Sequence, residues 1–149
     1  FTNFSQDHLD YHKNMRSYLY AKLVLFKKIL KKNSSVISDK NINEFTTLKK
    51  IAKTRELKMI EISKIIEKIN YISLVFNSEF EIKNLAMAAA AVKICGLKDK
   101  KVYGSLKKIK NIDGRLELAR RFPNNIKVFI DYAHTPDALL KVLKALTIS

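Results

Sequence analysis

Three features of the sequence predict an α/β fold. Short β-branched or aromatic runs alternate with segments whose apolar residues recur at helical spacing. The segment 82–95 is rich in alanine, which lets a helix pack close to a sheet. The last part of the chain, 127–146, reads as a strand, a loop and a helix in succession. In such folds the loops after the carboxyl ends of strands carry the ligands.

The length and composition fit one globular domain. The chain has 149 residues, of which 47% are hydrophobic, so a core is expected. No apolar run approaches about 18 residues, so we expect no membrane span. The first residues, Phe-Thr-Asn-Phe, contain neither a basic nor a long apolar stretch and show no signal peptide. Cys95 has no second cysteine to pair with, which fits a reducing compartment.

The chain carries a formal net charge of +15. Such an excess attracts polyanions such as nucleic acids, nucleotides or phosphorylated substrates. The basic residues are mostly lysines spread over almost every segment, whereas base recognition and bidentate phosphate binding favour arginine. We therefore do not expect dedicated nucleic-acid binding, although a basic polyanion-binding module remains an alternative.

The first third of the chain predicts a long helix after a polar segment. Phe1 to Phe4 alternate in polarity like the end of a strand, and Ser5 can cap a short helical turn. Asn14 resembles a second N-cap, followed by apolar residues at helical spacing from Met15 to Leu30. Residues 36–38 then predict a short buried strand, and a helix is expected over about 44–52.

The middle of the chain is harder to interpret. Residues 57–62 fit a strand, 65–69 fit either a helix or a strand, and 71–76 are β-branched and aromatic enough to predict a strand. Residues 82–95 predict a helix that Gly96 ends, and 98–109 predict another helix.

The C-terminal part alternates turns and strands. Residues 113–115 predict a turn, 116–119 a strand and 123–125 a tight turn. Residues 127–132 give the clearest prediction of a buried strand. Thr135 is expected to cap a final helix whose first residue is Pro136 and which continues through Leu146.

His8 and Lys22 are the first candidate site residues. They lie fourteen positions apart, which on one continuous helix would separate them by about 21 Å. They can meet only if the chain turns at Lys13–Asn14. A neutral lysine in apolar surroundings can add carbon dioxide, and the resulting carbamate can bind Mg²⁺ through oxygen. The alternatives are a lysine that extends its stem along the surface and a histidine that caps a helix.

A second constellation spans residues 131–137. Asp131, at the end of a strand, can accept ribose hydroxyls, and the start of the following helix can face phosphate. His134 can donate to a phosphoryl oxygen. The alternative is a capped strand–helix junction with a structural aspartate. Arg115, after the Gly114 turn, fits a phosphate clamp or an ordinary surface arginine.

Several motifs in order make the chain resemble the Mur ligase family. They are F-T-N-F-S-Q-D-H-L-D-Y-H at 1–12, Y-A-K at 20–22 with a following phenylalanine, F-E-x-x-N-L at 80–85, D-G-R-L-E at 113–117 and D-Y-A-H-T-P-D-A-L at 131–139. The resemblance implies a three-domain cytoplasmic enzyme. The chain would supply the second half of the central ATPase domain (1–126) and the first strand and helix of the C-terminal Rossmann-like domain (127–149). The G-x-x-x-x-G-K-[ST] phosphate loop of such an enzyme does not occur in the chain.

The resemblance also implies a reaction. Such enzymes use ATP and Mg²⁺ to form an acyl phosphate on a UDP-N-acetylmuramoyl-dipeptide, and a diamino acid, diaminopimelate or lysine, then attacks it. The missing N- and C-terminal parts of the same enzyme are the implied protein partners, and the chain alone would be inactive. Another amide ligase of the superfamily, similar to cyanophycin or folylpolyglutamate synthetase, is the alternative.

Family roles carry over to individual positions. Lys22 matches the carbamylated lysine and His8 the Mg²⁺ ligand. The remaining matches are at the nucleotide: Asn84 near adenine, Arg115 and Asp131 in contact with the nucleotide, and Tyr132 and His134 along the interdomain cleft, with His134 assigned a catalytic role. The family usually has Gln or Asn where this chain has Glu81, so a negative charge is expected near the nucleotide.

Overall fold

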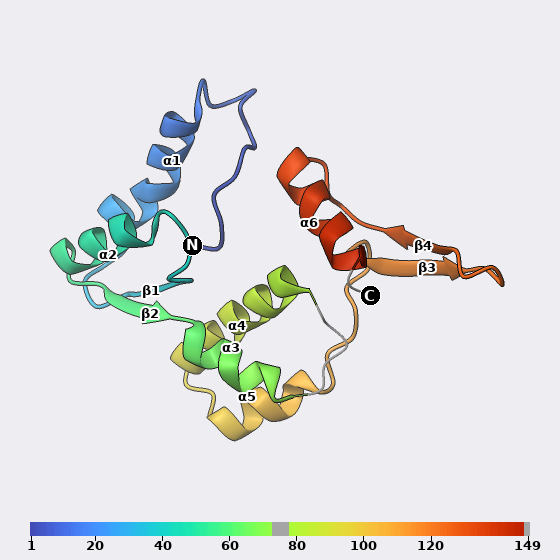
Figure 1. Ribbon diagram of the computed structural model, residues 1–149. Coiled ribbons are helices and arrows are strands. Elements are labelled where there is room, and N and C mark those ends of the chain that lie inside the picture. The colour runs from blue at the N-terminus through green and yellow to red at the C-terminus, as the bar shows by residue number, and fades with distance from the viewer. Residues whose placement is uncertain (73–77, 148–149) are drawn as a thin grey trace.

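The computed structural model describes residues 1–72 and 78–147 and confirms a mixed α/β architecture (Figure 1). Its elements, in chain order, are α1 (Met15–Val24), the π-helical turn η1 (Leu25–Ile29), β1 (Ser35–Ser38), α2 (Phe45–Thr54), β2 (Lys58–Glu61), α3 (Ser63–Asn70), α4 (Glu79–Ile94), α5 (Asp99–Leu106), β3 (Glu117–Arg121), β4 (Lys127–Ile130) and α6 (Pro136–Thr147). None of the helices in the described residues is long and apolar enough to cross a membrane.

β1, α2 and β2 form a parallel strand–helix–strand unit. The two strands pair in register from Ser35 with Lys58 to Ser38 with Glu61. Parallel neighbours need a crossover connection, and α2 provides it. The carboxyl ends of both strands therefore lie at one edge of the sheet, where Asp39 follows β1.

Two apolar clusters hold the helices around this unit. One joins α1, η1, β1 and α2 through the buried residues Leu23, Phe26, Val36, Leu48, Ala52 and Leu57. The other joins α3, α4 and α5 through Ile62, Ile65, Ile69, Ala86, Met87, Ala89, Ala90, Val102 and Leu106. The buried alanines allow α4 to approach its neighbours closely. Gly96 takes a φ of 95° just after α4, as expected for the residue that ends a helix.

β3 and β4 form an antiparallel hairpin that leads into α6. The prediction that 127–132 is a buried strand is correct for the strand and wrong for its burial. Val128 is 43% and Ile130 50% exposed. In the described residues β4 pairs with β3 alone, so both faces of a two-stranded ribbon remain open.

Three further predictions differ from the structure. Phe1 to Phe4 form no strand, although the Phe1 ammonium donates to the Ile37 carbonyl oxygen at 2.9 Å and places the segment beside β1. No helix follows Ser5 until Met15. Of the strand predicted over 71–76, residues 71 and 72 form a turn and a bend, and 73–76 lie outside the described residues.

Candidate active site

The chain turns where the sequence predicts a break, just before α1. Asn14 caps the helix, since its side-chain oxygen accepts the Ser17 N–H at 2.9 Å. The segment before Asn14 therefore folds back along α1 instead of extending it. As a result His8 and Lys22 both reach Tyr18, which satisfies the geometric condition for the two residues to meet.

Lys22 lies among aromatic rings and a carbonyl oxygen. Its Nζ donates to the Asn3 carbonyl oxygen at 2.9 Å and to the Tyr18 hydroxyl at 3.4 Å. It also lies 5.2 Å from the centre of the Phe1 ring and 5.1 Å from that of Tyr18. In the described part of the chain Lys22 forms no ion pair with a carboxylate. The surroundings of Nζ thus consist of two aromatic faces and two neutral oxygen atoms.

His8 is held by the loop that precedes α1. Its φ of 53° is in the left-handed region, and its N–H donates to an Asp7 carboxylate oxygen at 2.8 Å. The His8 ring meets the Tyr18 ring edge-on with centres 5.7 Å apart, and the His12 ring stacks on the same Tyr18 ring with centres 5.1 Å apart. The two imidazoles and Lys22 are thus gathered around one tyrosine.

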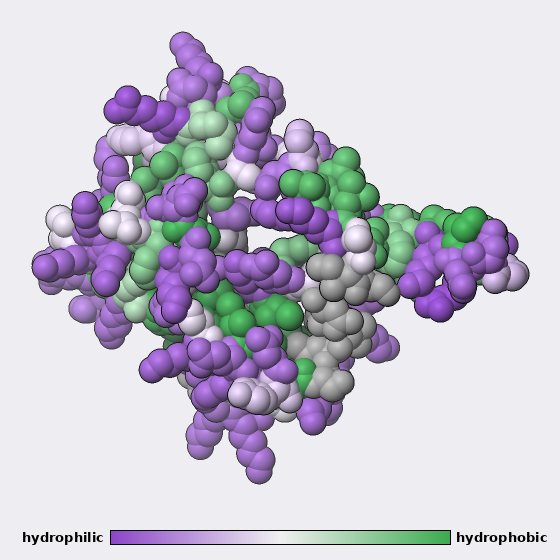
Figure 2. Space-filling view, viewed as in Figure 1, coloured by the Kyte–Doolittle hydropathy of each residue, from purple (hydrophilic) through white to green (hydrophobic). Residues whose placement is uncertain are grey.

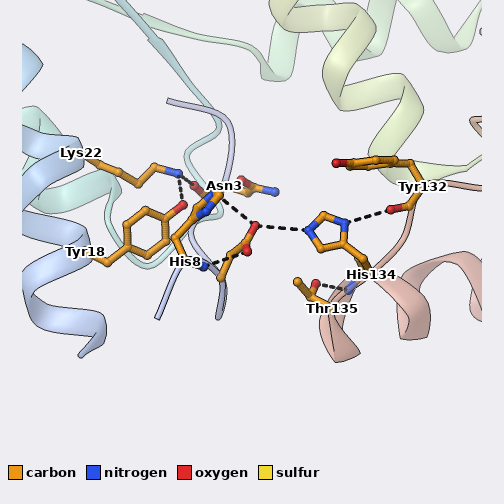
Figure 3. A network of polar contacts seen from close by, with 9 residues as sticks. Asn3, His8, Tyr18, Lys22, Tyr132, His134 and Thr135 are labelled. Carbon is orange, nitrogen blue, oxygen red and sulfur yellow. Dashed lines mark hydrogen bonds and ion pairs between the residues drawn. The ribbon is translucent and has the colours of Figure 1, made fainter. Parts of the chain in front are cut away.

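Asp7 joins this group to the far end of the chain. Figure 3 shows His8 and His134, the two residues that it links. Its Oδ2 lies 3.5 Å from Nε2 of His8 and 3.9 Å from Nε2 of His134. The two histidines are more than a hundred positions apart in sequence, and one carboxylate faces both. The structure therefore brings together the two constellations that the sequence presents separately.

The loop between β4 and α6 is ordered by local hydrogen bonds. The carboxylate of Asp131 accepts the Leu116 N–H at 2.8 Å and the Ala133 N–H at 2.7 Å, one on each oxygen. His134 Nδ1 lies 3.0 Å from the Tyr132 carbonyl oxygen. The Thr135 hydroxyl oxygen accepts the Ala138 N–H at 3.3 Å, which confirms it as the cap of α6.

Arg115 and Tyr132 stack beside this loop. The guanidinium carbon of Arg115 lies 4.7 Å from the centre of the Tyr132 ring, which in turn meets the His134 ring at 4.9 Å. A continuous series of contacts thus runs from Lys22 through Tyr18, His8, Asp7, His134 and Tyr132 to Arg115.

Asn84 does not join this series. It is exposed on α4, and no hydrogen bond within the described residues links it to the other candidates. The neighbouring Glu81 is used locally: its carboxylate oxygen lies 2.5 Å from the Ser78 hydroxyl and 3.3 Å from the Ser78 N–H, which completes a capping box at the start of α4. The negative charge at this position is therefore directed to the helix N-terminus.

The side chains gathered here supply only some of the ligands that Mg²⁺ prefers. Within the described residues no three His, Cys, Asp or Glu side chains gather to hold a metal. Mg²⁺ prefers oxygen ligands and is commonly held by one or two protein groups together with water and substrate phosphates. A carbamate on Lys22 would offer oxygen atoms of this kind, whereas His8 would offer a ring nitrogen.

Two contributors were not foreseen from the sequence. Tyr18 links His8 to Lys22, and Asn3 offers its carbonyl oxygen to the lysine. The four-residue spacing of Tyr18 and Lys22 on a helix was the available signal for the first. The second depends on how residues 1–4 fold back, for which the sequence has no local signal.

Comparison with known proteins identifies the family. Residues 1–70 match the family described as the Mur ligase middle domain. A UDP-N-acetylmuramoyl-L-alanyl-D-glutamate–2,6-diaminopimelate ligase from Rickettsia bellii is 37% identical over 98% of this chain and 34% of its own length. The chain belongs to the Mur ligase family. The ligase of the same name from Zymomonas mobilis is 32% identical over 98% of the chain and 35% of its own length.

Two solved structures share the fold. MurF from Acinetobacter baumannii superposes with a TM-score of 0.79 at 15% identity, over 99% of this chain and 36% of that one. A UDP-N-acetylmuramoyl-L-alanyl-D-glutamate–2,6-diaminopimelate ligase superposes with a TM-score of 0.68 at 22% identity, over 98% and 34%. The chain spans about a third of the length of the curated relatives it matches.

Proposed function

We propose that this Mur ligase chain supplies part of the catalytic centre of an ATP-dependent enzyme that adds a diamino acid to UDP-N-acetylmuramoyl-L-alanyl-D-glutamate. The observation that carries the proposal is the Asp7 carboxylate facing both His8 and His134, because it unites the residues matched at the two ends of the chain. The names of the relatives support the substrate, and diaminopimelate is the amine that those names specify.

In this proposal Lys22 acts as a carbamate and shares Mg²⁺ with His8. Within the described residues Nζ of Lys22 contacts the Asn3 carbonyl oxygen and the Tyr18 hydroxyl but no carboxylate, so a carbamate formed there would face no fixed anion. Bound Mg²⁺ would supply charge neutralisation at the phosphates. The chain's own contribution is to orient the two ligands, which Tyr18 does by contacting both.

The nucleotide would be held by the residues around the β4–α6 loop. Each carboxylate oxygen of Asp131 accepts one backbone hydrogen bond and has a second lone pair. Asp131 can therefore also accept hydrogen bonds from ribose hydroxyls. Arg115 and Tyr132 offer a cation and a ring at the same place, and Asn84 would contact adenine. His134 would face the phosphoryl group as a donor.

The reaction proceeds in two displacements. A substrate carboxylate oxygen attacks the γ-phosphorus of ATP, the bond to the β,γ-bridging oxygen breaks, and ADP leaves an acyl phosphate. The amine of the diamino acid then attacks the acyl carbon, inorganic phosphate departs, and the amine loses a proton to leave the amide. Residues 1–126 would belong to the central domain and 127–149 to the C-terminal domain, so the β3–β4 hairpin would join the two domains. The remainder of the same ligase would be the partner.

A chimera tests this function. The matching third of the Rickettsia bellii ligase is replaced by this chain, and phosphate release is measured with the UDP-dipeptide and either diaminopimelate or lysine. We expect turnover that requires both substrates, and none from the isolated chain. Lys22→Ala should lower turnover by at least about 100-fold, or about 2.7 kcal/mol, with partial rescue by a small carboxylate. The exposed Lys28→Ala should change it less than about twofold.

Mass spectrometry of the intact chimera adds a chemical readout, since carbamylation increases the mass of the peptide that carries Lys22. A folded chimera without turnover, or full activity of Lys22→Ala, would contradict the proposal.

A further inference from the structure

A buried charge pair joins the end of β1 to the start of α4. Asp39, directly after β1, is 1% exposed. Its Oδ1 accepts the Asn41 N–H at 2.9 Å, and its Oδ2 lies 2.9 Å from Nζ of Lys83 on α4. The same ammonium lies 2.7 Å from Glu79, one turn earlier on the helix. Lys83 thus bridges a buried carboxylate of the sheet edge and a solvated carboxylate of α4.

The pair is held in its charged form. Burial is the largest influence on Asp39 and by itself would raise its pKa, but the Asn41 N–H and Lys83 together outweigh it and bring the pKa below its ordinary value. Burial likewise opposes the charge on Lys83, and the Glu79 and Asp39 carboxylates reverse this and raise the pKa of the lysine. A buried carboxylate that loses its partner is costly, so the link resists separation.

The rest of α4 has other supports. The capping box of Ser78 and Glu81 defines its first turn, and the buried alanines 86, 89 and 90 pack its middle against α3 and α5. Formation of the helix therefore does not depend on Asp39. What the charge pair adds is the orientation of the first two turns of α4 relative to β1. The residue that follows Lys83 there is Asn84.

We propose that Asp39 is a positioning residue for the nucleotide: through Lys83 it holds the first two turns of α4 at the carboxyl end of β1 and so sets the place of Asn84. This inference rests on the proposed function, in which Asn84 contacts adenine. It adds a residue that lies outside the series of contacts from Lys22 to Arg115. It also assigns a function to the acid at the carboxyl end of a parallel strand, where α/β proteins bind their ligands.

Nuclear magnetic resonance of the ¹⁵N-labelled chain tests the structural part without a nucleotide. We expect Asp39→Asn and Lys83→Met to shift the Asn84 side-chain amide and the amides of residues 79–85, while the amides of residues 86–90 stay in place. Lys83→Arg, which keeps the charge, should leave Asn84 near its original position. Glu67→Gln, an exposed acid on α3, is the matched control. Unchanged Asn84 signals in Asp39→Asn would overturn the proposal.

Titration of the chimera with ADP, with each variant made in the chimera, then tests the functional part. We expect Asp39→Asn and Lys83→Met to weaken ADP binding about 3- to 10-fold, with Lys83→Arg and Glu67→Gln within about twofold of the original chimera. If Asn84→Ala weakens binding but Asp39→Asn does not, the positioning role is wrong and the proposed function stands. If ADP fails to bind, or if Asn84→Ala has no effect on it, the nucleotide assignment itself fails, and the positioning role fails with it.

Discussion

Two regions of the chain differ in how far their large apolar side chains are buried. In the body formed by α1–α5 with β1 and β2, Val36, Leu48 and Ile69 are at most 1% exposed. In the terminal unit formed by β3, β4 and α6, the large apolar side chains are mostly open to solvent, with Leu143 at 53%. Figure 2 shows apolar side chains gathered on the surface over α6.

The difference comes from the number of neighbours that each element has. Every helix of the body packs against another helix or against the parallel sheet, so its apolar stripe is removed from water. β4 and α6 also carry large apolar side chains, but the described residues offer too few partners to cover them. An amphipathic sequence therefore predicts that an element can be buried, whereas its neighbours decide whether it is.

The terminal unit reaches the body through polar contacts at the candidate site. The contact between Asp7 and His134 is partly exposed, and such ion pairs contribute only about 0–1 kcal/mol. The body should therefore carry most of the stability, while the terminal unit should be the easier part to displace.

The largest expected effect is on the core of the body. Ile69→Ala should lower the free energy of unfolding by about 2–5 kcal/mol, because it leaves a cavity between α3 and α4. The matched change in the terminal unit, Leu143→Ala, should cost less than about 0.5 kcal/mol. Urea denaturation followed by circular dichroism measures both. Equal losses would show that the terminal unit has a buried core of its own.

A smaller effect is expected at the start of α4. Ser78→Ala removes the hydroxyl of the capping box and should destabilise the body by about 1 kcal/mol. Thr135→Ala, the corresponding change at α6, should leave global unfolding almost unchanged and instead fray α6. Amide hydrogen exchange separates the two outcomes. Loss of protection throughout the body in Thr135→Ala would contradict the separation of the regions.

Acid should affect the body through Asp39. Its pKa is below the ordinary value of 3.8 in the folded chain, so the unfolded chain binds more protons in that range. The stabilisation is complete above pH 3.8 and is lost as the pH falls through the lowered pKa. Urea midpoints from pH 6 to 3 should fall less steeply in Asp39→Asn than in the original chain. A residual slope is expected from Glu61 and Asp99, whose pKa values are also lowered. If the urea midpoints of Asp39→Asn and of the original chain fall in parallel with pH, Asp39 does not form the stabilising pair with Lys83.

The smallest effect concerns the contact between the two regions. Asp7→Asn should cost only a few tenths of a kcal/mol but should broaden the distribution of distances between the body and α6. Spin labels on the native Cys95 and on Lys144→Cys report that distance. Asp10→Asn, in the same loop, is the control and should leave the distribution narrow. If the distance distribution in Asp7→Asn is as narrow as that in Asp10→Asn, contacts other than the one with Asp7 hold the terminal unit.

Local sequence signals predicted most helices correctly because their caps and periodicity are short-range. Asn14, Gly96 and Thr135 each mark a helix end where the sequence places one. The strand expected over 57–62 is confirmed as β2, for which β1 offers an edge for pairing. The segment 65–69 was ambiguous because a short run rich in isoleucine fits a strand and a helix equally well. The structure resolves it as part of α3, which packs on the apolar face of α4.

The sequence proposes members for the candidate site but does not indicate how they come together. Motif resemblance selected His8, Lys22, Arg115, Asp131, Tyr132 and His134, together with Asn84. Apart from Asn84 and Asp131, their side chains are linked through Tyr18 and Asp7, which requires the chain to reverse before Asn14 and the β4–α6 loop to return to Asp7. Glu81 shows the limit of motif comparison. The motif predicted that its negative charge lies near the nucleotide, whereas in the structure its carboxylate bonds to the Ser78 hydroxyl.

The sequence alone determined the α/β class, the helix ends, the family resemblance and the chemical types available to a site. These follow from interactions over a few residues and from the order of short motifs. Tertiary structure decided which apolar faces are buried and that Asp39 pairs with Lys83. It also decided that Asp7 faces both the adjacent His8 and the distant His134. Those outcomes depend on contacts between segments up to about 130 positions apart. The distances in these contacts determine the burial and the Coulomb energy, and no local sequence pattern encodes those distances.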